Sequence, residues 1–171
     1  MRTQRTRPRA GRTKKILLAG AVSLLLLEVA FLAWRLVFYQ PPYQPPAYEP
    51  AVQVGVPDPP EGMGYGQISA ENGFSFWVAG AMYQQEDGSL LVYLTNPADS
   101  VCNILCEITD QDGHTLYRSG ALRPGEFVER LYPLKQMENT TIEIQMNVYA
   151  FEPETWFSVG TITLNNTLHQ W

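Results

Sequence analysis

Few residues in this chain of 171 residues could carry out acid–base chemistry. It has only two histidines, His114 and His169, and catalysis by a histidine needs a nucleophile or a second titratable group beside it. His114 lies next to a predicted turn and His169 lies in the last three residues, with no nucleophile elbow or zinc motif around either. We therefore expect no catalytic residue, no cofactor and no enzymatic activity.

One pattern of oxygen ligands, Asp110-Gln111-Asp112-Gly113, is similar to the start of a calcium-binding loop. The third oxygen ligand and the distal bidentate glutamate of such a loop are absent from the sequence that follows. Aspartate and glycine in this order are also typical of a tight turn, so the pattern predicts a hairpin turn and no metal site.

The two cysteines, Cys102 and Cys106, are four residues apart in a segment that alternates like a strand. At about 3.3 Å per residue their Cα atoms would lie about 13 Å apart, whereas a disulfide needs a separation under about 7 Å. We expect both side chains to act as small buried apolar groups.

Aromatic side chains are the best indication of a binding surface, because exposed rings stack on sugars or anchor protein interfaces. Tyr149 is predicted on the outward face of a strand, and Trp156 is predicted in the loop that follows it. Both are therefore candidate interaction residues. Aromatic pairs across strands also stabilise sheets, and this alternative stays open.

An apolar run from Ile16 to Phe38 is 23 residues long, and a membrane-spanning helix needs roughly 20. Seven basic residues and no acidic residue precede it, a bias that keeps an N-terminus in the cytoplasm. We predict a basic cytoplasmic tail at residues 1–15, a signal-anchor span at residues 16–39, and a C-terminal part outside the cell. A cleaved signal peptide is the alternative, because residues 16–27 alone fit its apolar core.

Glu28 lies close to the middle of this run, where a charged side chain costs roughly 3 kcal/mol on insertion scales. Polar groups at that depth usually face a partner subunit or a cavity, so Glu28 is a candidate interaction residue. The alternative is a protonated Glu28, or one that pairs with Arg35 two turns later.

Residues 40–66 are rich in proline and glycine and predict a spacer. Proline-rich segments favour the extended polyproline II helix, which at ~3.1 Å per residue could hold a domain up to ~60 Å from the membrane. Pro45-Pro46-Ala47-Tyr48 also matches a ligand motif of WW domains. The expected topology puts this motif outside the cell, which favours the spacer.

Residues 67–168 predict an all-β domain. Seven apolar or alternating segments follow one another, separated by turn signals such as Asp87-Gly88 and Pro124-Gly125. Seven short strands with turns about every ten residues are typical of an immunoglobulin-like (Ig-like) antiparallel sandwich. The clearest segment, residues 140–150, alternates apolar and polar side chains along its length.

Charge is divided unequally along the chain. Four basic and sixteen acidic residues follow Gln40, which gives this part a net charge of −12. We expect no nucleic-acid binding by this part, because contacts with phosphates require basic residues.

A resemblance to a known family rests on two motifs, Leu94-Thr95-Asn96-Pro97 and Leu116-Tyr117-Arg118-Ser119-Gly120-Ala121-Leu122-Arg123-Pro124-Gly125. They are similar to motifs of an uncharacterised family of membrane-anchored Firmicutes surface proteins with an Ig-like extracytoplasmic domain. The resemblance covers about residues 89–164 and implies a bacterial cell-envelope protein without a known catalytic function.

Together these features predict a non-enzymatic, single-span cell-envelope protein that displays an Ig-like interaction domain outside the membrane. Its partners would be the membrane and an envelope protein, either in adhesion or as an accessory subunit of a surface complex. The alternative is a glycan-binding module that uses Tyr149 and Trp156 on a cell-wall or host glycan.

Overall fold

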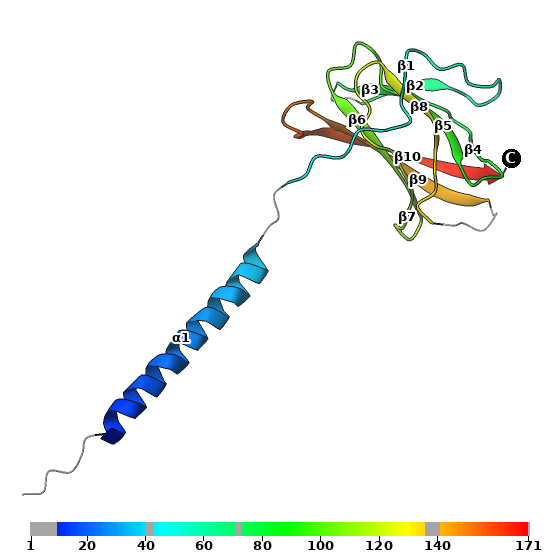
Figure 1. Cartoon of the computed structure of the whole chain (residues 1–171). Helices are drawn as coiled ribbons and strands as arrows, with labels where there is room; N and C mark the ends of the chain where they lie inside the picture. Colours follow the sequence, from blue (N-terminus) through cyan, green and yellow to red (C-terminus); the bar gives the residue numbers. More distant parts are fainter. Residues whose placement is uncertain (1–9, 40–42, 71–72, 136–140, 171) are drawn as a thin grey trace, which may run out of the picture. The chain divides into compact units, whose positions relative to one another are not determined.

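The structure, a computed structural model, describes residues 10–39, 43–70, 73–135 and 141–170, with side chains from Gly20 onward except at residues 21 and 170. The chain divides into two compact units, residues 1–44 and residues 45–171. Helix α1 (Ala10–Phe38) is the only helix in the described parts, and ten strands make up the second unit (Figure 1). The all-β prediction for the folded domain is therefore confirmed. Most of the predicted tail, residues 1–9, lies outside the described residues.

Helix α1 is apolar around its circumference. Four consecutive leucines, residues 24–27, cover every side of it because successive helical residues turn by about 100°, and they are 62–68% exposed. The helix ends at Phe38, shortly before Pro41 and Pro42 in the sequence, which cannot continue a helix. Among the described residues, no helix is both long enough and apolar enough to cross a membrane.

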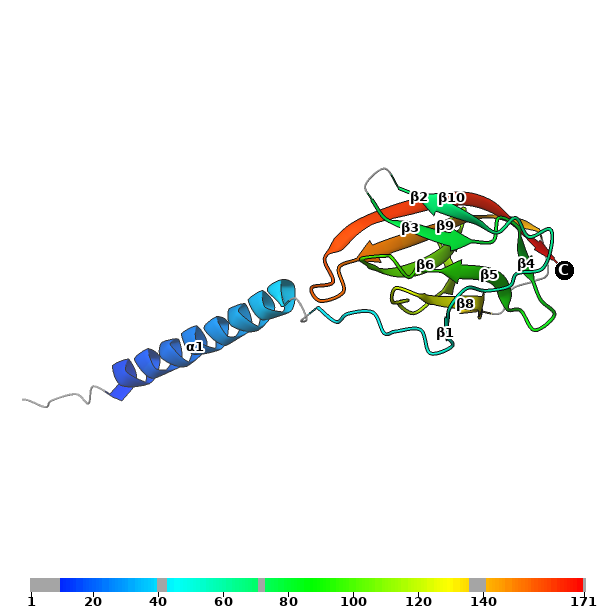
Figure 2. The same cartoon turned by 90° about the horizontal axis from the view of Figure 1, so that it is seen from above.

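The strands form one curled sheet, seen from above in Figure 2. They are β1 (Gln53–Val54), β2 (Gly66–Ser69), β3 (Ser75–Val78), β4 (Met82–Gln84), β5 (Leu90–Thr95), β6 (Asn103–Asp110), β7 (Thr115–Arg118), β8 (Glu126–Leu131), β9 (Ile142–Phe151) and β10 (Ser158–Gln170). Their order is β1-β8-β5-β4-β10-β9-β6-β7, and β3 pairs with both β5 and β2. Every pair is antiparallel except β4 with β10, which is parallel.

The seven predicted strands correspond to β3 and to β5 through β10. The last of them continues beyond its predicted end at Leu164 to Gln170, and β1, β2 and β4 were not predicted as separate strands. The turn before β8 has the predicted chemistry: Gly125 has a φ of 80°, a conformation that side chains with a Cβ rarely adopt. Local turn and strand patterns thus locate the elements well.

The main hydrophobic core lies inside the curl. Alternate residues of β9, such as Met146 and Val148, point into it with 0% exposure, and Phe76 of β3 meets them there. A second, smaller cluster lies on the other face of β5 and contains Met63 and Tyr93. All six residues of β5 are therefore buried, since both faces of this strand are covered.

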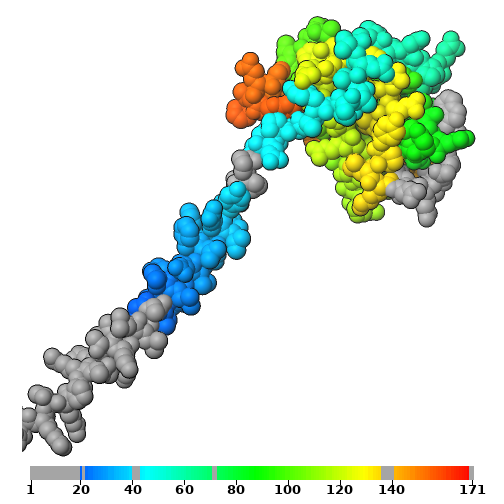
Figure 3. Space-filling view, viewed as in Figure 1, coloured from blue at the N-terminus to red at the C-terminus, as the bar shows by residue number. Residues whose placement is uncertain are grey.

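The spacer prediction for residues 40–66 is wrong from Pro45 onward, because this segment is folded onto the sheet. We call residues 45–65 the strap. Ala121 N donates to the Ala47 carbonyl at 2.9 Å, Glu49 N donates to the Ala121 carbonyl at 3.0 Å, and β1 pairs with β8. Figure 3 shows the strap, in cyan, against yellow residues of the β unit. The strap also supplies Met63, which is 2% exposed.

Gly120 permits the close approach of the strap. Its N–H donates to Oε2 of Glu49 at 2.7 Å. A Cβ at Gly120 would lie 2.7 Å from the carbonyl carbon of Tyr48 and closer still to the backbone of Glu49. Composition predicted a free proline-rich segment here. It cannot reveal that Gly120, 71 residues from Glu49 in the sequence, donates a backbone hydrogen bond to that residue.

We predict that Gly120→Ala displaces the strap, since the added methyl group would overlap the backbone of Tyr48 and Glu49. Cleavage of the Tyr48–Glu49 bond by chymotrypsin, followed by mass spectrometry, should become much faster in this variant. Gly66→Ala is the control, because a Cβ there makes only an ordinary contact at 3.9 Å. Equal cleavage rates in the two variants would contradict the attachment of the strap.

We also predict that Met63→Ala lowers the free energy of unfolding by roughly 2 kcal/mol or more, the usual cost of removing a buried methionine side chain. Val56→Ala, on the same strap but at a side chain that is 86% exposed, should change it by less than about 0.5 kcal/mol. Urea unfolding of the full chain in detergent measures both. Similar small values would mean that the strap does not contribute to the core.

Candidate functional site

Trp156, predicted as an exposed ring after β9, is partly buried among other rings. Its ring centroid lies 5.7 Å from that of Tyr48 and 6.0 Å from that of Phe151. The Arg123 guanidinium lies 3.7 Å from the centroid of the Tyr48 ring, within the range of a cation–π interaction. This cluster fastens the strap to the sheet, so the Trp156 ring is engaged in packing and does not form an open stacking surface.

Tyr149, the second predicted interaction residue, is partly buried on β9, and its Oη donates to Oε2 of Glu107 at 3.2 Å. Burial, followed by the negative charge of Glu107, raises the pKa of the Tyr149 phenol above its ordinary value. In the described part of the chain, no ring contact joins Tyr149 to Trp156. The two rings are therefore not in contact with each other.

Glu28 lies on α1 with an exposed side chain. The two ion pairs among the described residues join His114 to Asp110 and Arg123 to Glu126, so Glu28 does not pair with Arg35 there. Seven helical residues separate Glu28 from Arg35 by about 10 Å along the axis, which is too far for a direct ion pair. A contact of Glu28 with a partner helix stays a prediction.

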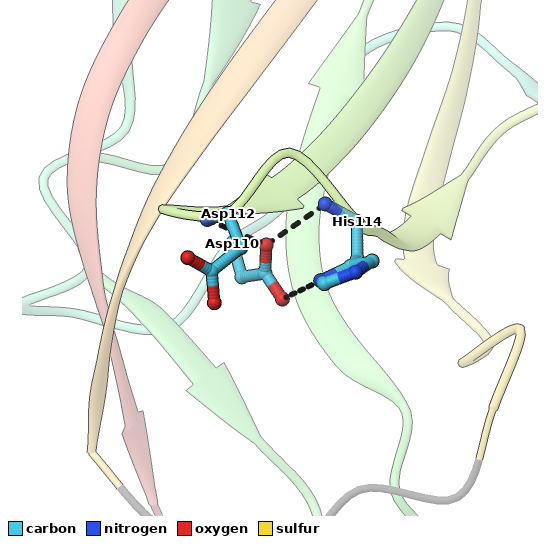
Figure 4. Close-up of side chains that lie close together, drawn as sticks. All are labelled: Asp110, Asp112 and His114. Carbon is cyan, nitrogen blue, oxygen red and sulfur yellow. Dashed lines mark hydrogen bonds and ion pairs between the residues drawn. The ribbon is translucent and has the colours of Figure 1, made fainter.

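Asp110, Asp112 and His114 form the one group of candidate metal ligands in the described ranges, with ligand atoms within 4.8 Å of one another (Figure 4). Asp110 Oδ1 accepts the N–H groups of Asp112 and His114 at 2.9 and 2.8 Å. Asp110 Oδ2 lies 3.0 Å from Nδ1 of His114. Both oxygens of Asp110 are thus used to close the turn between β6 and β7, as expected for a hairpin turn.

The two cysteines have the predicted structural role. Cys102 and Cys106 are free thiols with 1% and 0% exposure. Burial raises the pKa of the Cys106 thiol far above its ordinary value, so this group stays protonated and unreactive at neutral pH.

An apolar hollow lies where the end of β1 approaches β3, and the sequence did not predict it. Its volume is about 370 Å³, within the usual size range of ligand pockets. The side chains that line it are mostly apolar and include Val54, Val56, Tyr65, Trp77, Pro97 and Ala98.

The two rings in this hollow are held in a defined arrangement. Tyr65 and Trp77 are stacked with centroids 5.5 Å apart, and Tyr65 Oη donates to Oγ1 of Thr95 at 2.8 Å. Beside them, Asn96 is fully buried and donates from Nδ2 to the carbonyls of Cys102 and Leu122. The hollow therefore has a rigid aromatic wall and few exposed polar groups.

The hollow escaped prediction because its parts are distant in sequence. In the sequence Asn96-Pro97 indicates only a family resemblance, and Val54 and Val56 lie in the segment predicted as a spacer. Tyr65 lies close to Trp77 because β2 pairs with β3, and β2 was not predicted from the sequence.

Comparisons of this chain with protein-family models, with curated proteins and with solved structures found no match. The resemblance to membrane-anchored Firmicutes surface proteins therefore stays a prediction.

We predict that Asp110→Asn destabilises the protein in a pH-dependent manner. Hydrogen bonds from His114, first from its backbone N–H, hold the pKa of Asp110 below its ordinary value. A lowered pKa means that ionised Asp110 stabilises the fold above its unfolded pKa of ~3.9, and that this contribution is lost as the pH falls through the folded value. Wild type and variant should thus differ at neutral pH and converge in acid.

Thermal unfolding measured from neutral to acidic pH tests this prediction. Asp112→Asn is the matched control, since its side chain takes no part in the hydrogen bonds of the turn. A constant difference between wild type and Asp110→Asn at every pH would contradict the proposed role of the ionised carboxylate.

Proposed function

We propose that this chain is a non-enzymatic, single-span cell-envelope protein whose β unit is an Ig-like interaction domain outside the membrane. In this proposal residues 16–39 anchor the protein, the N-terminus is cytoplasmic, and the domain binds a protein partner of the envelope. Adhesion and service as an accessory subunit are both compatible with such a domain.

The observation that carries the proposal is the division of the chain into an apolar helical unit and a compact β unit. A helix with leucines on every side has no polar face for water, and so it needs an apolar environment. The sequence supports a membrane as that environment, because the apolar run of 23 residues follows seven basic residues.

The strand order supports the Ig-like interpretation. β10, β9, β6 and β7 are successive neighbours, as are the G, F, C and C′ strands of Ig sandwiches, while β3, β5 and β8 correspond to A, B and E. β4 matches the second half of the A strand, which leaves its first sheet and pairs in parallel with the last strand. β6, at the C-strand position, lacks the tryptophan of antibody domains, so the interpretation rests on strand order.

The hollow beside Trp77 favours a protein partner over a glycan. Sugars require polar groups for their hydroxyls, whereas valine, proline and alanine side chains surround the stacked rings here. Val54 and Val56 at its rim are 83% and 86% exposed, as expected for side chains that pack against a partner. The glycan alternative loses support because Tyr149 and Trp156 are both partly buried.

We predict that a partner which co-purifies with the full chain from its own membranes in gentle detergent is lost in Val56→Ser. This substitution removes apolar surface at the hollow without disturbing the core, because Val56 is 86% exposed. Val101→Ser is the matched control, since Val101 is 80% exposed and lies outside the hollow. Recovery should be measured by quantitative mass spectrometry.

Glu28→Leu separates the contributions of the two units. Loss of the partner in Glu28→Leu alone would move recognition to the helix, and equal loss in Val56→Ser and Val101→Ser would argue against the hollow. Extraction of the full chain from membranes by alkaline carbonate would overturn the anchor itself, because a spanning helix resists this treatment.

A further inference from the structure

Strand β10 has an open edge along residues 161–165. It pairs with β9 over almost its whole length, but on its other side the one described strand that pairs with it is β4, at Leu168–Gln170. Phe74 packs against Gly160 at one end of the open edge, and Asn166 Nδ2 donates to the carbonyl of Gly80 at the other end. Between these contacts no described strand pairs with the edge.

Burial along β10 shows the consequence of this opening. Val148 and Met146 of β9 are 0% exposed, yet their cross-strand neighbours Ile162 and Leu164 of β10 remain partly exposed. Leu168, on the same strand and with the same inward direction, is 0% exposed where β4 covers the edge. Ile162 and Leu164 are therefore partly exposed because no described strand pairs with β10 beside them, as β4 does beside Leu168.

The other edges of the sheet have the usual protection against pairing with foreign strands, which is shortness or cover. Strand β1 has two residues and β2 has four. Strand β7 is covered, since Tyr117 is bridged to Pro133 and Leu134 N donates to the Leu116 carbonyl. β10 has 13 residues, and none of them is proline, lysine, arginine, aspartate or glutamate. An uncharged, open edge, here residues 161–165 of this strand, is a template for a further strand.

We propose that this edge pairs antiparallel with the same edge of a second copy of the chain, about a two-fold axis at Thr163. In this register Thr163 faces its own copy, Ile162 faces Leu164, and Thr161 faces Asn165. Apolar side chains meet on the inner face and uncharged polar side chains meet on the outer face, pairs that stabilise sheets. The two sheets become one continuous sheet, and an isologous interface of this kind closes as a dimer.

Charge favours a second copy over a basic foreign segment as the occupant. The chain after Gln40 has a net charge of −12, so a foreign basic segment would be drawn to its carboxylates, and none of these lies on β10. Two acidic domains repel each other less when they meet through uncharged surfaces than when they meet through surfaces that carry carboxylates. The uncharged edge is where copies of this domain can approach.

The experiment is disulfide trapping of the full chain in detergent and in native membranes. Thr163→Cys brings two thiols opposite each other in the proposed register, where paired Cα atoms lie about 4.5–5.5 Å apart. Mild oxidation should convert most of this variant to a covalent dimer. The native thiols of Cys102 and Cys106 do not interfere, since both are buried.

Asn165→Cys is the matched control, on the same edge and likewise exposed. In the proposed register its two thiols would be four residues apart along the strands, about 13 Å, so no disulfide should form. Gln53→Cys, on the short edge strand β1, controls for random collision and for association through α1. Thermal unfolding of each variant should match that of wild type, since Thr163, Asn165 and Gln53 are exposed.

A dimer from Thr163→Cys but not from Asn165→Cys or Gln53→Cys establishes the pairing. Absence of a dimer from Thr163→Cys in both settings overturns it and leaves the edge to a foreign strand. Equal trapping of all three variants also overturns it, because encounters without register would then explain the links. None of these outcomes depends on the hollow beside Trp77, so the proposed function is tested separately.

Discussion

The parallel pairing of β4 with the end of β10 is the constraint on which the shape of the sheet depends. Three residues of each strand, Met82–Gln84 and Leu168–Gln170, join the part of the sheet made by β5 and β8 to the part made by β9, β6 and β7. Because β4 also pairs with β5, this junction bends the sheet back over itself. Met82 and Leu168 meet there with no exposed surface, so the main core is closed at its end by backbone and side chains together.

The same junction accounts for the uneven surface of the β unit. β10 is 13 residues long, but β4 occupies only its last three, because the chain leaves β3 near Gly80 to enter the second part of the sheet. The short strand β4 therefore both closes the core and leaves part of the β10 edge exposed. A longer β4 would cover more of β10 and would bury Ile162 and Leu164 as fully as Leu168 is buried.

The strap is the second contribution to stability that depends on distant contacts. Its prolines cannot donate backbone hydrogen bonds. The backbone N–H groups of Glu49 and Gly55 do donate, to the carbonyls of Ala121 and Gly125. The aromatic cluster around Trp156 then covers Tyr48 of the strap. The rings that the sequence suggested for binding, Tyr149 and Trp156, thus contact other residues of the domain. The hollow beside Trp77, in contrast, takes Val54, Val56 and Tyr65 from the segment predicted as a spacer.

How far the sequence predicted the structure varied with the kind of interaction. The seven main strands, the helix and the turns at Asp110–Gly113 and Pro124–Gly125 were predictable, because alternation, helical apolar runs and glycine conformations act within a few residues. The buried thiols followed from the same alternation. No local pattern could predict the curl, since its closing pair joins Met82 to Leu168.

From the sequence alone, then, came the all-β domain, the apolar helical segment before it, the acidic charge and the absence of a recognisable catalytic or metal motif. These properties depend on residue type and short-range periodicity. Only the tertiary structure decided that the strap is folded, that Trp156 is packed and Tyr149 is bonded, and that β10 has an open edge. Each of these depends on which distant segments meet, as Gly120 meets Glu49 across 71 residues, and that is settled by packing of the whole domain.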